Sequence, residues 1–202
     1  MVENVESKAA LLVKWLCVMM YAATASIINT VMNPLPFMPA AITTWVGRIV
    51  MVIMILCMFR LAPVSKRYQT AGILRTVTLI CTLIGTYWLA SGLLTLTASI
   101  LSIIAVYQEY TAHAELVADK DNKLSHKWHS LFIWGIVSGI LVGLGSTVAV
   151  LIATFAGFDV VNITAILVGI LGIPQFIIDV VYLLYLKKMR IIFRTDSMPV
   201  PV

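Results

Sequence analysis

A chain of 202 residues that is 61% hydrophobic and only 11% charged cannot hide its apolar surface in one water-soluble core. Its formal charge of +5 does not predict a nucleic-acid groove, because every Lys and Arg except Arg48 flanks a long apolar segment. Composition therefore argues against a soluble domain and a nucleic-acid partner. It predicts a single integral membrane domain, residues 1–202, whose main partner is the lipid bilayer.

Six apolar segments approach the length of about 20 residues that a helix needs to cross the hydrocarbon core. The stretch from Ile73 to Ala118 is too long for one crossing, so a turn at Ala90-Ser91-Gly92 is expected to divide it. The second half is expected to continue as a helix into the cytoplasm. In chain order the predicted spans cover about residues 9–30, 42–61, 73–90, 93–110, 128–155 and 161–186.

The positive charges predict how these spans are threaded. Lys and Arg gather in segments that can share one side of the membrane, whereas residues 33–41, 90–92 and 156–160 contain none. Because short basic loops stay cytoplasmic, we expect an all-α, polytopic helical bundle of three hairpins with cytoplasmic N- and C-termini. Trp and Tyr near the span ends favour the same arrangement. The expected location is the plasma membrane of a bacterium.

The first span contains the small-residue pair Ala22-x-x-x-Ser26. Together with six short spans and both ends inside, this resembles in layout the small substrate-binding subunits of energy-coupling vitamin transporters. In that family an Ala-x-x-x-Ala stripe on the first span mediates docking, and the second alanine is missing here. The resemblance therefore implies the architecture alone, and no site residue is carried over.

An acid inside the sixth span is the most specific indication of a site. Asp179 is costly in hydrocarbon unless it faces the bundle, a partner or water. Gln175 lies one helical turn before it and Tyr182 about one turn after it, which predicts a polar pocket. The candidate counter-charge is Lys14 in the first span. Such a pair would be a proton or ion site, or a structural ion pair, while Lys14 alone would snorkel to the interface.

Arg48 lies about two turns inside the expected outer end of the second span. It is too far along the membrane normal to pair easily with Asp179. Snorkelling to the outer lipid headgroups is the favoured interpretation. The alternative is an anionic substrate that enters from outside.

Gly135, Gly139 and Gly143 recur every four residues in the fifth span. Such a stripe of small residues lets a neighbouring helix approach closely. Packing inside the bundle is the favoured interpretation. The alternative is a face for a second copy of the chain or for a partner membrane subunit.

Carboxylates and histidines follow the fourth span. Their helical spacing favours a solvated cytoplasmic hairpin with ion pairs, and hence a docking surface. The alternative is a catalytic or metal site, although no H-E-x-x-H is present and no cofactor or metal is predicted. The docking candidates are Glu109, His113, Glu115 and Asp119, whereas the catalytic alternative would use Glu109, His113, His126 or His129.

Three functions remain open from the sequence. The first is a transporter, channel or substrate-binding membrane subunit for a small solute or ion. The second is a non-catalytic accessory, sensor or assembly subunit of a membrane complex. The third, and the least favoured, is a membrane enzyme with its site on the cytoplasmic face.

Overall fold

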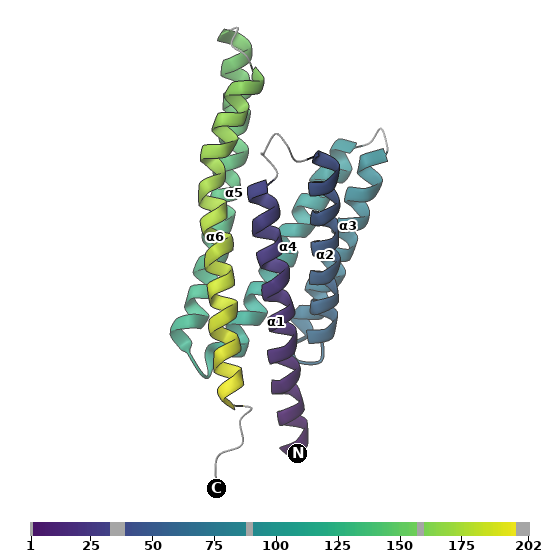
Figure 1. Cartoon of the computed structure of the whole chain (residues 1–202), viewed down its shortest axis with the longest axis vertical. Coiled ribbons are helices and arrows are strands. Elements are labelled where there is room, and N and C mark those ends of the chain that lie inside the picture. The colour runs from purple at the N-terminus through teal and green to yellow at the C-terminus, as the bar shows by residue number, and fades with distance from the viewer. Residues whose placement is uncertain (1, 33–38, 88–90, 157–159, 197–202) are drawn as a thin grey trace.

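Each predicted span overlaps a different helix, although the last residues of the third span, 88–90, lie outside the described residues. The computed structural model describes residues 2–32, 39–87, 91–156 and 160–196, with side chains for 8–32, 39, 41–85, 92–142, 144, 145, 148 and 172–195. These residues form six α-helices and no strand (Figure 1), which confirms the all-α prediction. The helices are α1 (Val2–Met32), α2 (Ala40–Leu61), α3 (Lys66–Tyr87), α4 (Ser91–Ala118), α5 (Asn122–Ala156) and α6 (Val160–Asp196).

The long apolar stretch after residue 73 is divided into two helices, although Ser91 and Gly92 of the predicted turn lie in the second of them. One helix ends at Tyr87 and the next begins at Ser91, although residues 88–90 lie outside the described residues. The second helix runs to Ala118, so it does continue beyond the predicted end of the fourth span. Threonines are tolerated inside α3 because their hydroxyls donate back to carbonyls four residues earlier, as Thr78 does to Leu74.

Side-chain caps start two of the helices. The hydroxyl of Ser65 accepts a hydrogen bond from the backbone N–H of Arg67 at 3.3 Å, at the first turn of α3. Asp121 accepts one from the N–H of Leu124 at 2.9 Å, at the first turn of α5, and pairs with Lys188 of α6 at 2.5 Å. The hydrogen bond from Lys188, followed by that from Leu124, lowers the pKa of Asp121.

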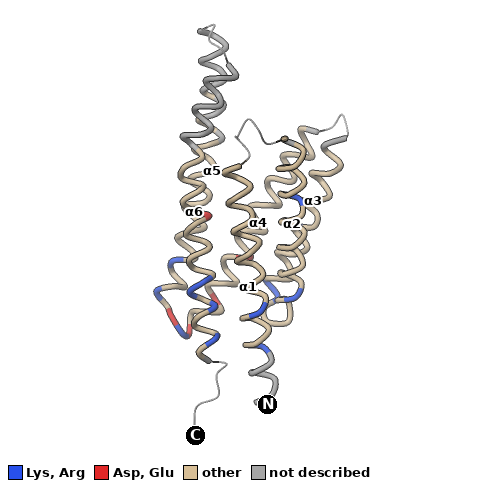
Figure 2. The backbone as a smooth tube through the Cα atoms, viewed as in Figure 1, with Lys and Arg blue, Asp and Glu red and all other residues tan. Residues whose placement is uncertain are grey.

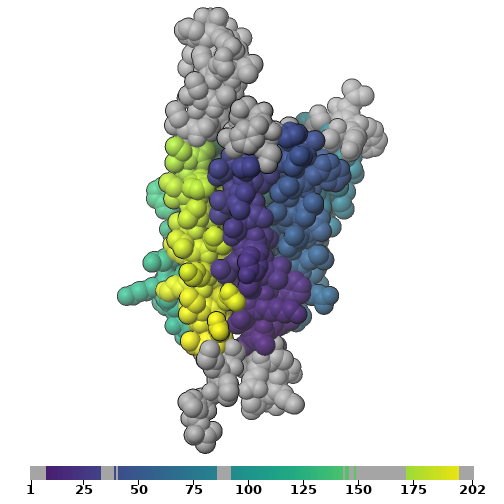
Figure 3. All heavy atoms as spheres, viewed as in Figure 1, coloured from purple at the N-terminus to yellow at the C-terminus, as the bar shows by residue number. Residues whose placement is uncertain are grey.

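The helices form a closed ring. Each packs against the next along the chain, and α6 returns to pack against α1. Figure 3 shows α6, α1 and α2 side by side on one face. The approach of α3 to α2 is close at Gly72, where an added Cβ would lie 3.2 Å from Cβ of Met58. The ring therefore places side chains of all six helices around one central axis.

The core occupies one half of this ring, towards the connections formed by residues 62–65 and 119–121. We call the end of the bundle at these connections the basic end, because most Lys and Arg of the described residues gather there (Figure 2). The start of α1 and the end of α6 lie at the same end (Figure 1). Fully buried side chains in this half include Leu16, Met58, Leu61, Trp128 and Leu186. The bundle is thus tightly packed at its basic end.

The outer surface is apolar. Ile49, Leu96, Ile133 and Leu144 are among many large hydrophobic side chains that are exposed. Among the described residues, three stretches are long and apolar enough to cross a membrane, namely Lys8–Met32, Ala41–Leu61 and Gly92–Ala118. Immersion in lipid favours an apolar exterior of this kind, because lipid does not penalise exposed Leu and Ile side chains.

Candidate functional site

A buried ion pair lies inside the ring. Arg75 of α3 and Glu109 of α4 approach to 2.5 Å, and their side chains are 18% and 1% exposed. A buried carboxylate is costly unless it is paired and hydrogen-bonded. Tyr182 of α6 supplies a further donor, since its hydroxyl lies 2.5 Å from the second oxygen of Glu109. One acid therefore connects three helices.

Aromatic rings pack beneath this pair on the side of the basic end. Tyr110 stacks on Tyr182 with ring centroids 5.4 Å apart. Trp128 of α5 is fully buried and lies edge-on to both rings. Aromatic contacts of this kind stabilise beyond the area they bury. They close the centre of the ring towards the basic end.

His113 connects this cluster to the start of α3. Its Nδ1 lies 2.7 Å from the hydroxyl of Tyr68, and its Nε2 lies 3.8 Å from Glu109. Burial, together with the negative charge of Glu109, raises the pKa of Tyr68 well above 10, so the phenol stays protonated. Tyr68 can therefore donate to Nδ1, which leaves the proton of a neutral imidazole on Nε2, facing Glu109.

A cavity of about 460 Å³ lies above the ion pair, away from the basic end. Its size is in the range of small-molecule sites. Most of the wall is apolar, and Arg75 and Glu109 form its charged floor. All six helices contribute to the wall, in chain order through Ala22, Gly47, Arg75, Glu109, Gly135 and Asp179.

The predicted polar pair on α6 forms part of this wall. The amide of Gln175 donates to Asp179 at 3.2 Å, and Tyr182 lines the same cavity. These three predicted site residues are therefore brought together.

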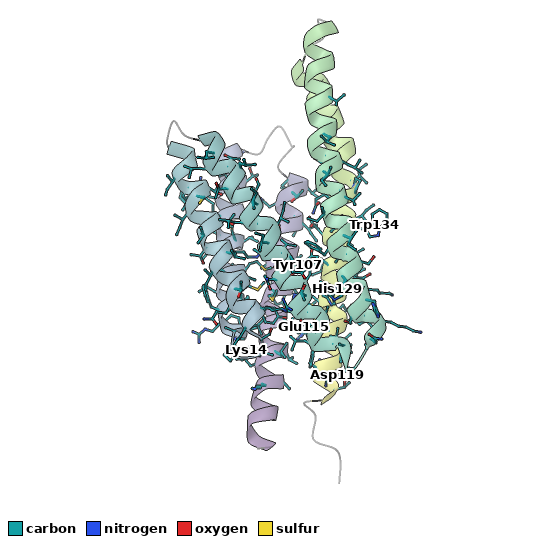
Figure 4. The ribbon with its side chains drawn as sticks, turned by 180° about the vertical axis from the view of Figure 1, so that it is seen from behind. Lys14, Tyr107, Glu115, Asp119, His129 and Trp134 are labelled. Atoms are coloured by element: carbon teal, nitrogen blue, oxygen red, sulfur yellow. The ribbon has the colours of Figure 1, made fainter. Side chains whose placement is uncertain are left out.

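Lys14 does not join them. It is exposed and lies eight residues before Ala22, where the first helix begins to line the cavity, a displacement of about 12 Å along a helix. The predicted counter-charge role of Lys14 is therefore wrong, because the two spans were aligned at the wrong depth. Figure 4 shows Lys14 on α1, towards the basic end.

A second hollow of about 770 Å³ adjoins the first, between α3, α4 and α5. The two share Ser102, Ile103, Gly135 and Ile136 as lining residues. Threonine and serine hydroxyls contribute to the second hollow, including those of Thr78 and Ser99. The two hollows are therefore neighbours on one side of the ring.

The glycines of α5 line these hollows instead of a tight helix contact. A Cβ added at Gly135 or Gly139 would meet no described atom within 4 Å. The prediction of close packing inside the bundle is therefore wrong for these two, because the small residues leave space that no described helix fills. The surroundings of Gly143 lie outside the described residues, and the use of this face by a partner subunit stays a prediction.

The predicted docking surface divides into buried and exposed parts. Glu109 and His113 are fully buried, so their assignment to a solvated surface is wrong: α4 turns that face into the bundle. Glu115 is exposed and pairs with Arg67 at 2.8 Å, and Asp119 is exposed at the end of α4 (Figure 4). Their role in docking stays a prediction.

Among the described residues, His126 and His129 do not join Glu109 and His113 in the bundle. His126 and His129 are exposed, apart from the buried His113. Within the ranges that the structure describes, no three His, Cys, Asp or Glu side chains are grouped so as to hold a metal ion. The enzyme interpretation therefore gains no support from the described part of the chain.

Arg48 lies outside the cavity wall. Its guanidinium carbon is 5.1 Å from the centroid of the Trp45 ring, an arrangement that gives a cation–π contact on α2. An anionic substrate at Arg48 is thus not supported by a described pocket.

Arg75 is the central residue that the sequence did not single out. Its position near the start of a predicted span makes it indistinguishable from the other basic flanking residues. The predicted span that contains Arg75 has no acid, so a counter-charge for its guanidinium has to come from another helix.

No protein-family model, curated protein or solved structure matches this chain. Function must therefore be inferred from the cavity itself.

Proposed function

We propose that this chain is a small multi-pass membrane protein that binds and moves a small solute or ion, as a transporter, channel or substrate-binding membrane subunit. The supporting observation is the cavity of about 460 Å³ at the centre of a closed ring of six helices. Its floor carries Arg75 and Glu109, and its wall carries Asp179. Ionisable groups that face an internal cavity are expensive in a membrane and typical of solute or ion pathways.

The positions of the two hollows indicate the end of the bundle from which a solute would enter. The aromatic cluster around Trp128 closes the ring towards the basic end, and the second hollow extends the cavity away from it. A solute would therefore reach the ion pair from the opposite end. Movement to the basic end would require the contacts among Tyr110, Trp128 and Tyr182 to separate. This is an alternating-access arrangement in which one side is closed while the other is open.

The proposed topology has all six helices crossing the plasma membrane of a bacterium, with both termini in the cytoplasm. Support comes from the three apolar stretches and from the basic end that collects the connections and both ends of the described chain. In a background with Cys17, Cys57 and Cys81 replaced by alanine, we expect Arg67→Cys and Lys123→Cys to react with an impermeant thiol reagent from the cytoplasmic side only. Pro39→Cys, an exposed position just before α2, serves as the control and should react from the other side. Reaction of Arg67→Cys and Lys123→Cys from opposite sides would contradict the six-span arrangement.

Transport is tested at Asp179. Solutes that stabilise the detergent-solubilised protein against heat, chosen from a panel of cations, anions and neutral compounds, are followed into proteoliposomes. We expect Asp179→Asn to lower uptake by at least about tenfold, which corresponds to about 1.4 kcal/mol of lost interaction. The reason is that the amide keeps the size of the side chain and removes its charge from the cavity wall.

Asp119→Asn is the matched control, because Asp119 is an exposed acid at the end of α4 and outside the cavity. Its uptake should equal that of the unmodified protein. Equal uptake by Asp179→Asn, with both variants folded by size-exclusion chromatography, would reject the proposed role of the cavity. Loss of folding in Asp179→Asn alone would favour a structural acid.

A further inference from the structure

We infer that the solute held in the central cavity is an organic monocation, with Asp179 as its counter-charge, an inference that rests on the proposed function. The described lining residues include one cationic side chain, Arg75, and two acids, Glu109 and Asp179. With all three ionised, the wall carries one net negative charge. A positively charged solute would balance it.

The negative charge is concentrated on Asp179. Arg75 and Glu109 neutralise one another at 2.5 Å, and Tyr182 donates to the same acid. Asp179 instead has only the amide of Gln175, a neutral donor, at 3.2 Å. No described cationic side chain forms an ion pair with it. Its carboxylate is only half-buried and lines the cavity, so a solute can reach it.

The rest of the wall favours an organic ion over a bare divalent metal ion. Divalent metal ions need several oxygen ligands at once, and Mg²⁺ and Ca²⁺ take six or more. The described wall offers apolar side chains such as Met54 and Val106 around the single free carboxylate. The Tyr110 and Phe132 rings also line it, with centroids 6.4 Å apart and planes at 78°. Aromatic faces and one carboxylate recognise alkylammonium-like and arylphosphonium-like cations.

Tetraphenylphosphonium is a suitable probe, because it combines one positive charge with aromatic surface, and tetraphenylborate has nearly the same shape with the opposite charge. Equilibrium dialysis of the full chain in detergent, corrected with protein-free micelles, measures the binding of each. We expect saturable binding of tetraphenylphosphonium and at least about tenfold weaker binding of tetraphenylborate. Asp179→Asn should weaken phosphonium binding by a similar factor, because its wall no longer carries net charge.

Two variants separate charge from folding. Asp179→Glu keeps the charge and should bind the phosphonium within about threefold of the unmodified protein, a difference below the tenfold step that about 1.4 kcal/mol produces. Asp119→Asn, which removes an acid outside the cavity, should bind it unchanged. If Asp179→Asn fails to fold, the comparison of the two probes on the unmodified protein decides. Absence of saturable phosphonium binding, equal binding of both probes, or full binding by folded Asp179→Asn would each overturn the inference.

The experiment also distinguishes this inference from the proposed function. Uptake of a neutral or anionic solute that depends on Asp179 would support the proposed function and overturn the cation. Saturable phosphonium binding that depends on Asp179, without uptake of any solute in the panel, would support the cation site and overturn transport by the chain alone.

Discussion

Glu109→Gln is expected to lower the free energy of unfolding by about 3–5 kcal/mol, since it leaves a buried guanidinium without its counter-charge. Arg75 is only 18% exposed and Glu109 1% exposed, so the guanidinium has little contact with water that could replace the lost partner. The same change weakens the hydrogen bond from Tyr182, which lies 2.5 Å from the acid. Reversible unfolding in mixed detergent micelles measures the loss.

The chain offers a matched control for this change. Glu115 is also on α4 and also pairs with an arginine of α3, Arg67, but the two side chains are 52% and 38% exposed. Solvent screens such a pair, so Glu115→Gln should cost no more than about 1 kcal/mol. Replacing both buried partners, as Arg75→Met with Glu109→Met, should recover most of the loss, because no buried charge is left unpaired. Equal losses of unfolding free energy for Glu109→Gln and Glu115→Gln would show that the buried pair stabilises the fold no more than the exposed pair does.

Trp128→Ala is expected to cost about 3–5 kcal/mol, the range for truncating a large aromatic side chain in a packed core. Its ring lies 4.6 Å from His113, 5.4 Å from Tyr110 and 5.6 Å from Tyr182, centroid to centroid. Removing it leaves a void beneath the ion pair that these rings cannot fill without losing contact with one another. Thermal unfolding in detergent measures the cost.

Trp134 provides the comparison, because it lies on the same helix and its side chain points away from the bundle (Figure 4). Trp134 is 62% exposed, so Trp134→Ala should leave thermal unfolding nearly unchanged. The free energy of unfolding should change by no more than about 0.5 kcal/mol, as is usual for surface positions. If both tryptophan variants melt at the same temperature, the aromatic cluster does not close the ring as described.

The helices could be predicted from sequence because their signal is local. Apolar length and the division of the stretch from Ile73 to Ala118 depend on neighbouring residues, and the structure has two separate helices there, one ending at Tyr87 and the next beginning at Ser91. The pocket on α6 followed from the same kind of reasoning. Gln175, Asp179 and Tyr182 share a face because they are spaced by about one helical turn, and all three line the cavity.

The partners across helices could not be predicted in this way. Glu109 and Glu115 look alike in sequence, six positions apart on α4, yet one is buried and one is exposed. Which face of a helix turns inward depends on packing against its neighbours, and the high overall hydrophobicity gives little amphipathic contrast to reveal it. Lys14 failed as the counter-charge for a related reason, because relative depth depends on how two helices are aligned.

Pairing between α3 and α4 has a consequence for biosynthesis. Of the described helices, α3 is not among those apolar enough to enter lipid by composition, and it carries Lys66, Arg67 and Arg75. An arginine costs up to about 2.5–3.5 kcal/mol on the translocon scale, the full amount applying to the centre of an inserting helix, and Arg75 lies nearer the start of its predicted span. Its neutralising partner, Glu109, is synthesised only with the following helix. In the proposed six-span topology, the nascent α3 would therefore wait at the translocon until α4 emerges, and the two would leave it together as one hairpin.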